Sequence, residues 1–246
     1  MRSNESGPRP DDAVVRWVGR PGMGSIVTAM LGDTEVMFRH EVGSLERNSS
    51  VWRLVMRSDQ GASENIFDEL IISIPAPQAA RLLAPVAPHL ALQAEQIEME
   101  PCWAVMLAAA HPLNAPFDSV VVENGGPLAW AACENSKPFR ATLHERWVLH
   151  AAPAWSREHL ESDPAWVSQE LTRAFAELLG VRHPNLETTH ALAHRWRFAR
   201  VAKPLGQPFL RDPELGLTVC GDWLLGARVE AAWSSGTAAA ACIAES

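Results

Sequence analysis

The chain has 246 residues, of which 47% are hydrophobic and 20% are charged, and its formal net charge is −8 at pH 7. A chain of this length and composition can bury a sizeable core and form one large domain or two interleaved ones. Because its arginines are scattered among acidic residues, we do not expect it to bind nucleic acid, which requires clustered Lys and Arg.

The first twelve residues are polar and contain Pro and Gly but no apolar run, so they do not predict a secretory signal. No stretch of about 18 apolar residues occurs in the sequence, and we therefore expect no membrane span. The expected location is the cytoplasm. Residues 14–18 predict a short strand, residues 19–24 a glycine-containing turn, and residues 25–31 a helix.

The next segments predict further strands. Residues 35–45 and 51–56 alternate in hydrophobicity, which indicates an antiparallel pair. Residues 70–74 form a β-branched run of the kind found in strands buried on both faces of a sheet, and a helix is expected over residues 78–83. The middle of the chain predicts a second sheet with strands at residues 103–109, 119–122, 128–132 and 147–151. An amphipathic helix is expected over residues 162–179, with Gly180 as its stop.

The C-terminal segment contains the most informative pattern. Residues 217–220 predict a short strand, Gly221 and Asp222 a turn, and residues 229–243 an Ala-rich helix. An Asp at the carboxyl edge of a strand can accept hydrogen bonds from sugar or ribitol hydroxyls, and free amides at a helix N-terminus attract an electron-rich group. The residues by themselves fit a cofactor clamp and an ordinary strand-to-helix connection of an α/β fold equally well.

Cysteine and histidine patterns do not predict a metal site. The four cysteines lie far apart without a C-x-x-C motif, so neither zinc nor a redox dithiol is indicated. His183, His190 and His194 lie close together, but no pair has the H-E-x-x-H spacing that places two imidazoles on one helix face. We expect these histidines to lie on loops or helix surfaces.

Several segments resemble one enzyme family. The string GDWLLGARVEAAWSSGTAAA, at residues 221–240, resembles the C-terminal flavin motif of the FAD-dependent amine oxidase superfamily. ISIPAPQAARLL, EPCWAVML, WAACENSKPFR, WVLHAAPAWSREHLE and HRWRFA resemble successive segments of its bacterial renalase-like, NAD(P)/FAD-dependent subgroup. RWVGRPGMGSIV is similar to a segment that lies downstream of the family's FAD fingerprint. The resemblance extends from about residue 14 to residue 243.

The resemblance implies roles for individual residues. Asp222 would hydrogen-bond the ribityl or pyrophosphate region of FAD, Val229 and Glu230 would present backbone amides to the flavin pyrimidine edge, and the backbone of Val42 would meet the adenine. The full set of cofactor-binding residues expected from it is Val42, Gly221, Asp222, Gly226, Arg228, Val229 and Glu230.

The candidates near the flavin ring come from the same resemblance. Trp196 and Trp130 are expected to line the space beside the ring, and Lys137 is similar to the lysine that positions a water at the flavin in some amine oxidases. The alternative for the two tryptophans is a place in the core or wall, and for Lys137 a solvated loop.

The expected fold is α/β (mixed α+β). Residues 1–74 and 203–246 would form an incomplete FAD/NAD(P)-binding Rossmann-like domain, and residues 75–202 an inserted substrate domain on a mixed or antiparallel sheet. Members of the family open with G-x-G-x-x-G, whereas Gly19–Gly24 has the spacing G-x-x-G-x-G with a proline inside. Since altered spacing defeats the fingerprint, we interpret the chain as lacking the N-terminal unit.

Two functions follow as hypotheses. The first is an FAD-dependent oxidoreductase of amine-oxidase or renalase type, which transfers a hydride from an amine or a reduced nicotinamide-like substrate to flavin. The second is a truncated, non-catalytic remnant that acts as a binding module or is completed by a partner. The expected partners are a small-molecule substrate and, as a possibility left open, a second chain or a homo-oligomer. An NAD(P)-dependent dehydrogenase is disfavoured because Glu41 comes too early to bind the ribose.

Overall fold

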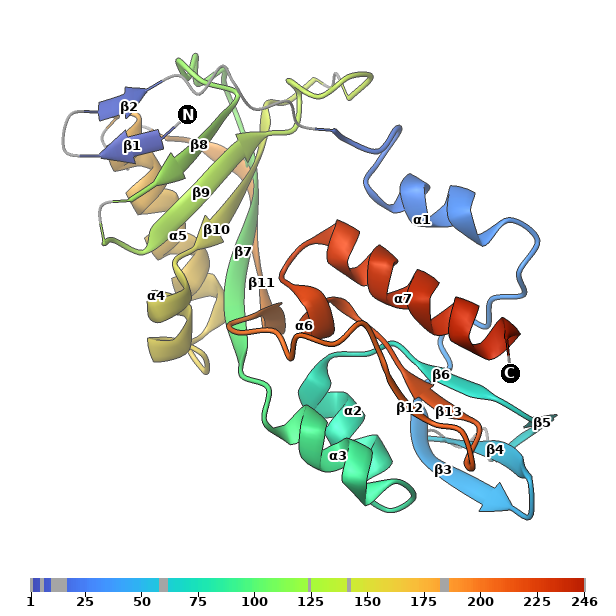
Figure 1. Cartoon of the computed structure of the whole chain (residues 1–246). Coiled ribbons are helices and arrows are strands. Elements are labelled where there is room, and N and C mark those ends of the chain that lie inside the picture. Colours follow the sequence, from blue (N-terminus) through green and yellow to red (C-terminus); the bar gives the residue numbers. More distant parts are fainter. Residues whose placement is uncertain are drawn as a thin grey trace. The chain divides into compact units, whose positions relative to one another are not determined.

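The computed structural model describes residues 2–4, 7–9, 17–57, 62–123, 125–140, 143–181 and 186–245. The chain divides into two compact units (Figure 1). The first unit comprises Met1–Glu35 and Pro101–Arg197, and the second comprises Val36–Glu100 and Phe198–Ser246. The mixed α/β fold class agrees with the sequence-based prediction.

The boundaries of the units differ from the predicted domains. Residues 1–35 group with the central part of the chain, although we predicted them in the FAD-binding domain. Residues 75–100 group with the C-terminal part, although we predicted them in the substrate domain. The physical reason for the second difference is that Ala79, Leu83 and Leu90 share a buried core with Leu217 and Val219. The functional assignment of each unit stays a prediction.

A seven-stranded sheet with the order β11-β7-β10-β9-β8-β1-β2 forms the centre of the first unit. Its strands are β1 (Arg2–Asn4), β2 (Gly7–Arg9), β7 (Met99–Ala109), β8 (Ser119–Val122), β9 (Leu128–Cys133), β10 (Arg146–Ala151) and β11 (Thr188–Val201). The predicted meander is confirmed for β8, β9 and β10, which are antiparallel neighbours. The strand β7 pairs with β10, although β8 and β9 lie between these two strands in the sequence.

The long strand β11 was not predicted. It contains His190 and His194, which we expected on loops or helix surfaces, and this expectation was wrong because both lie on β11. His183 and most of the predicted strand at residues 14–18 lie outside the described residues. The predicted helix at residues 25–31 is confirmed as α1 (Gly24–Leu31).

Helices cover one face of the first unit's sheet. They are α4 (Pro153–Glu158) and α5 (Pro164–Leu178). The side chain of Asp163 caps α5 by accepting hydrogen bonds from the backbone N–H groups of Ala165 and Trp166. Phe175 of α5 is fully buried and its ring centroid lies 4.9 Å from that of Trp147. Since side chains alternate along a strand, Arg146, Val148 and His150 of β10 lie on the opposite face.

The second unit has two three-stranded sheets. One has the order β12-β13-β6, and the other has the order β3-β4-β5. Their strands are β3 (Val42–Asn48), β4 (Val51–Met56), β5 (Ala62–Phe67), β6 (Leu70–Ile72), β12 (Leu210–Asp212) and β13 (Leu217–Val219). The predicted antiparallel pair is confirmed as β3 and β4, but its first strand spans Val42–Asn48, so the prediction was wrong for residues 35–41. The strand β6 is parallel to β13 and lies at the edge of its sheet.

Residues 70–74, which contain β6, were predicted to form a strand buried on both faces of a sheet, and this prediction was wrong for β6. The side chain of Ile71 is 49% exposed, whereas its neighbours Leu70 and Ile72 are buried. A run of β-branched residues reports strand propensity, but it does not report whether the second face of the sheet is covered.

The helices of the second unit are α2 (Ala76–Leu83), α3 (Pro88–Glu95), α6 (Asp222–Leu225) and α7 (Val229–Ala244). On α2, the buried residues Ala76, Ala79, Ala80 and Leu83 follow the three-to-four-residue spacing of one helix face. Across the residues described, none of the helices is both long enough and apolar enough to cross a membrane.

Candidate functional site

The loop after β13 brings together the C-terminal residues predicted to bind a cofactor. The backbone N–H of Cys220 donates to the carbonyl of Ile72 on the parallel strand β6 at 3.0 Å. Gly221 follows with φ 152°, and its N–H donates to Oγ of Ser235 on α7 at 2.9 Å. Ser235 is fully buried, and its hydroxyl donates to the carbonyl of Pro208 at 2.6 Å. One buried serine therefore ties this loop to helix α7.

Gly221 is required by its surroundings as well as by its backbone angle. A Cβ atom at this position would lie 2.9 Å from Nε1 of Trp223. Trp223 is fully buried and donates from Nε1 to the carbonyl of Ile74 at 3.1 Å, so it cannot move away without losing that bond. The close approach fixes the position of the next residue, Asp222.

Asp222 is a half-buried carboxylate at the first position of α6. Burial raises its pKa above the ordinary value of an aspartate, and the backbone N–H groups of Trp223 and of Asp222 itself offset part of this rise. Among the described residues, no basic side chain forms an ion pair with it. A partly desolvated acceptor without a counter-charge fits a ligand that donates hydrogen bonds.

The N-terminus of α7 lies three residues beyond Gly226. Arg228 precedes the helix in an extended conformation, and no side chain caps the first turn in the part of the chain that the structure describes. The backbone N–H groups of Ala231 and Ala232 bond to the carbonyl of Arg228. The side chain of Val229 is 72% exposed, which places the first amides of the helix at an open surface. Such an end carries a partial positive charge.

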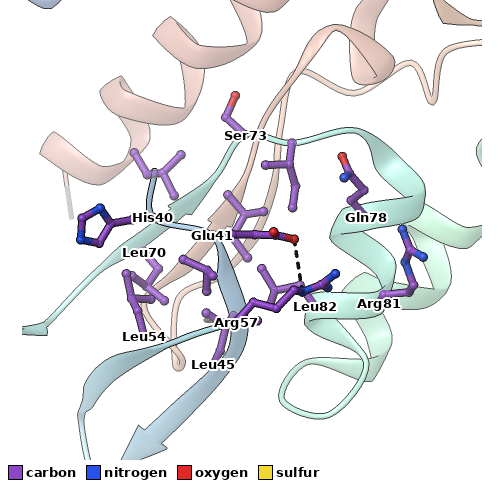
Figure 2. A pocket seen from close by; sticks show the side chains of 15 residues that line it. His40, Glu41, Leu45, Leu54, Arg57, Leu70, Ser73, Gln78, Arg81 and Leu82 are labelled. Atoms are coloured by element: carbon purple, nitrogen blue, oxygen red, sulfur yellow. Dashed lines mark ion pairs between the residues drawn. The ribbon is translucent and has the colours of Figure 1, made fainter. Parts of the chain in front are cut away.

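A cavity of about 470 Å³ lies against β3, β6 and α2 of the second unit (Figure 2). Apolar side chains including Val42, Leu54 and Ile72 line it. At its rim, Glu41 and Arg57 form an exposed ion pair with an N–O distance of 3.2 Å (Figure 2). Its volume falls within the range of small-molecule sites, and its lining combines apolar walls with a few polar groups.

Val42 lies next to an irregularity of β3. The register of the ladder shifts between Val42 and Ser44, as in a β-bulge, and Gly43 packs so closely that a Cβ there would lie 3.2 Å from the Cα of Arg57. The structure thus places Val42 in the cavity wall, at a point where the regular pairing of the strand is interrupted.

The cavity and the C-terminal loop lie near the same end of one parallel strand pair. The cavity lining includes Ser73 and Ile74, directly after β6, and Asp222 follows the end of β13. Because β6 and β13 are parallel, their carboxyl ends meet at one edge of the sheet. In open α/β sheets, ligands bind outside this edge.

The first unit contains the residues that we predicted near the reacting atoms. Trp130 on β9 lies opposite His150 on β10, and their ring centroids are 4.8 Å apart. Burial lowers the pKa of His150, and the nearby positive charge of Lys137 lowers it further. The structure therefore brings Trp130 and Lys137 to the surroundings of one histidine, which the sequence reasoning had not identified.

Lys137 forms an ion pair with Glu134, and so does Arg140. Burial raises the pKa of Glu134, but the hydrogen bonds from Lys137 and Arg140 outweigh this effect and lower it overall. An ammonium group has three N–H donors, so the contact with Glu134 leaves donors on Lys137 for another acceptor.

Trp196 is not part of this group. It lies on β11, three strands from β9 in the sheet order, and its side chain is 56% exposed. Its ring contacts His194 in a T-shaped arrangement with a centroid distance of 4.5 Å.

Two functional candidates escaped the sequence reasoning for different reasons. Ser235 looks like one of several small residues on α7, and only its burial against Gly221 shows its role. His150 could have been found from the alternation of residues 146–151, which places it on the polar face of a strand, but its pairing with Trp130 depends on the register of β9 and β10. Within the described ranges, no group of three or more potential metal-ligating side chains occurs.

The model of the family of flavin-containing amine oxidoreductases matches residues 11–244. Similar solved structures include a protein assigned as a protoporphyrinogen oxidase from Exiguobacterium sp. 255-15, with 18% identity and a TM-score of 0.69, over 92% of this chain and 51% of that one. Cyclohexylamine oxidase from Brevibacterium oxydans IH-35A has 13% identity and a TM-score of 0.64, over 91% of this chain and 52% of that one.

An oxidoreductase from Methanosarcina mazei has 17% identity and a TM-score of 0.55, over 81% of this chain and 48% of that one. The chain thus spans about half the length of these structures, and at such identities they establish the similarity of fold. The family match covers nearly the whole sequence, and the chain belongs to the family of flavin-containing amine oxidoreductases.

Proposed function

We propose that this chain forms part of an FAD-dependent oxidoreductase of amine-oxidase or renalase type. The substrate would be an amine or a reduced nicotinamide-like compound, and bound FAD would supply the acceptor for a hydride. The observation that carries the proposal is Asp222, a half-buried carboxylate without a basic partner among the described residues, which is followed by the short helix α6 and then by the uncapped N-terminus of α7.

Each part of the site fits one part of the cofactor. The carboxylate of Asp222 can accept hydrogen bonds from the ribityl hydroxyls, and the first amides of α7, at Val229 and Glu230, can donate to the carbonyl oxygens of the pyrimidine edge. The cavity beside Val42 has apolar walls and a polar rim, which suit a planar heterocycle such as adenine. Gly221 and Gly226 would keep the loop close to the ligand, and Arg228 begins α7.

On the substrate side, we propose Trp130, His150 and Lys137. The indole of Trp130 would form a wall beside the substrate, and Lys137 would hold a water or a substrate oxygen through its remaining donors. His150 favours its neutral form, so it can accept a hydrogen bond or a proton at pH 7. Trp196 remains a candidate for the wall, although it contacts His194 and lies three strands from β9 in the sheet.

Replacing His150 by Gln is expected to reduce the loss of stability on acidification. The pKa of His150 is lower in the folded state than in the unfolded state. Below about pH 6.5 the unfolded chain therefore binds more protons than the folded chain, and the free energy of unfolding decreases as the pH is lowered. The variant lacks this contribution. Thermal unfolding at pH 7 and pH 5 measures it, with His190→Gln as the exposed control. If the Tm of His150→Gln depends on pH as strongly as that of the wild type, the burial assigned to His150 is wrong.

A second candidate function, a module completed by another polypeptide segment, is favoured by one observation. The family's G-x-G-x-x-G sequence, which binds the pyrophosphate, does not occur in the 246 residues. In the described part of the chain, β6 is an edge strand with an exposed Ile71. Such an edge can pair with a further strand, from the same protein or from a second chain.

Titration of the purified chain with FAD tests the proposal. Absorbance of bound FAD and quenching of its fluorescence report binding. Saturable one-to-one binding at micromolar FAD would support a site formed by the residues named above. If no binding occurs up to millimolar FAD, the chain does not bind flavin by itself, and the module completed by another segment is the better description.

A further inference from the structure

A second cavity, of about 550 Å³, lies in the first unit. Its floor is formed by β7 and β10, on the side of the sheet opposite α5, and includes Met106 and Val148. Its walls are formed by the turn at Gly22 and by Phe139 and Arg140. The proposed function does not use this cavity.

Arg140 builds the wall. Its guanidinium donates to Glu134, to the carbonyl of Gly19 at 3.0 Å and to the carbonyl of Pro21 at 3.0 Å. These bonds join the turn at Gly19–Gly22 to the segment after β9, two regions far apart in the sequence. With its donors used in this way, Arg140 holds the two segments of the wall together.

Phe139 completes the wall next to Arg140. Its φ of 61° is unusual for a bulky residue, and its side chain is 71% exposed. The guanidinium carbon of Arg20 lies 3.2 Å from the centroid of its ring. A strained aromatic residue exposed at a cavity mouth offers an apolar surface to a ligand.

The charge around the cavity is the reverse of that of the whole protein. Lys137 and Arg140 both pair with Glu134, which leaves one net positive charge in that cluster. Arg146, at the start of β10, lines the cavity and is exposed, and no acidic side chain pairs with its guanidinium in the described ranges. With the guanidinium of Arg20 over the ring of Phe139, the surroundings carry three net positive charges in a protein with a net charge of −8.

We propose that this cavity binds a small organic carboxylate. The guanidinium of Arg146 would hold the carboxylate, and the apolar body of the ligand would lie against Met106, Val148 and Phe139. The planar fork of the Arg146 guanidinium matches the two oxygens and single charge of a carboxylate.

The position of the cavity connects it with the proposed substrate site. Arg146, Val148 and His150 lie on one face of β10 at alternate positions, so Arg146 and His150 are about 13 Å apart along the strand. A ligand anchored at Arg146 extends over Val148 toward Trp130 and His150. The identification of the bound carboxylate as the acidic group of an oxidised substrate rests on the proposed function. Binding of a carboxylate at Arg146 itself requires no flavin.

Three ligands of similar size and different charge test the carboxylate site: benzoate, benzamide and benzylamine. Isothermal titration calorimetry on the full chain without flavin, at low salt and pH 7, is expected to detect millimolar benzoate binding and at least about tenfold weaker binding of the other two. Arg146→Gln should weaken benzoate binding about tenfold or more, and Arg146→Lys by a smaller factor. Arg53→Gln, an exposed strand arginine of the second unit, is the matched control and should bind like the wild type.

Absence of benzoate binding by the wild type, equal binding of benzoate by Arg146→Gln, or equal binding of benzylamine would each overturn the proposal. Because the measurement contains no FAD, its outcome is independent of the flavin titration. If the chain binds benzoate but not FAD, the proposed carboxylate site is supported and the proposed flavin site is rejected. If it binds FAD but not benzoate, the flavin site is supported and the carboxylate site is rejected.

Discussion

Replacing Asp222 by Asn is expected to stabilise the protein while weakening FAD binding. The raised pKa of Asp222 means that the folded state disfavours its charged form, so the neutral isostere should raise the free energy of unfolding and the Tm at pH 7. The same change removes a charged acceptor from the ribityl hydroxyls and should reduce FAD affinity about tenfold or more.

The pH dependence of this stabilisation has a definite sign. Between the ordinary pKa of aspartate, about 3.9, and the raised pKa in the fold, the native state binds more protons than the unfolded state. Stability contributed by Asp222 therefore falls as the pH rises through this window. Thermal unfolding at pH 7 and near pH 4 should show the advantage of Asp222→Asn shrinking at the lower pH.

Asp212 provides the matched control for Asp222. Its carboxylate accepts from the backbone N–H of Leu215 at 3.0 Å and lies 3.1 Å from Nε2 of His89, so it has the imidazole partner that Asp222 lacks. Asp212→Asn should leave FAD binding unchanged and should not stabilise the protein. If Asp222→Asn instead lowers Tm without affecting FAD binding, Asp222 has a structural role and the assignment to the cofactor is wrong.

Replacing Ser235 by Ala is expected to cause the largest loss of stability among the variants considered. The buried hydroxyl serves both Gly221 and Pro208, and its removal leaves the N–H of Gly221 and the carbonyl of Pro208 without that partner. Leaving buried polar groups unpaired costs about 1–3 kcal/mol. Since the same bond holds the loop before Asp222, FAD affinity should fall as well.

Denaturant unfolding and FAD titration of Ser235→Ala measure both effects. Ser234→Ala is the control, because Ser234 is the neighbouring residue on α7 and its side chain is exposed. Its stability should lie within about 0.5 kcal/mol of the wild type. Equal behaviour of the two serine variants would show that the buried hydroxyl does not hold the loop.

Local patterns were sufficient for several elements. The glycine turn followed by apolar residues predicts α1, the alternation on each side of a polar turn predicts β3 and β4, and the Ala-rich segment predicts α7. Strand and helix periodicities are properties of consecutive residues, so the sequence reports them directly. The string at residues 221–240 also indicated the family, which the match over residues 11–244 establishes.

Non-local pairing was not accessible in the same way. The sequence did not show that β7 lies beside β10, that residues 188–201 form one long strand, or that residues 75–100 share a core with β13. These arrangements depend on which buried faces meet, and several partners of equal hydrophobicity compete for each face.

The sequence by itself determined the mixed α/β class and, in the C-terminal motif, the strand β13 and the long helix α7, but not the short helix α6, which begins at Asp222 where a turn was predicted. Only the tertiary structure decided that Val42 lines a cavity, that Ser235 holds Gly221, and that His150 lies against Trp130. The physical reason is that a motif is a run of neighbouring residues, whereas burial, pKa and hydrogen-bond partners arise from residues that folding brings together from distant parts of the chain.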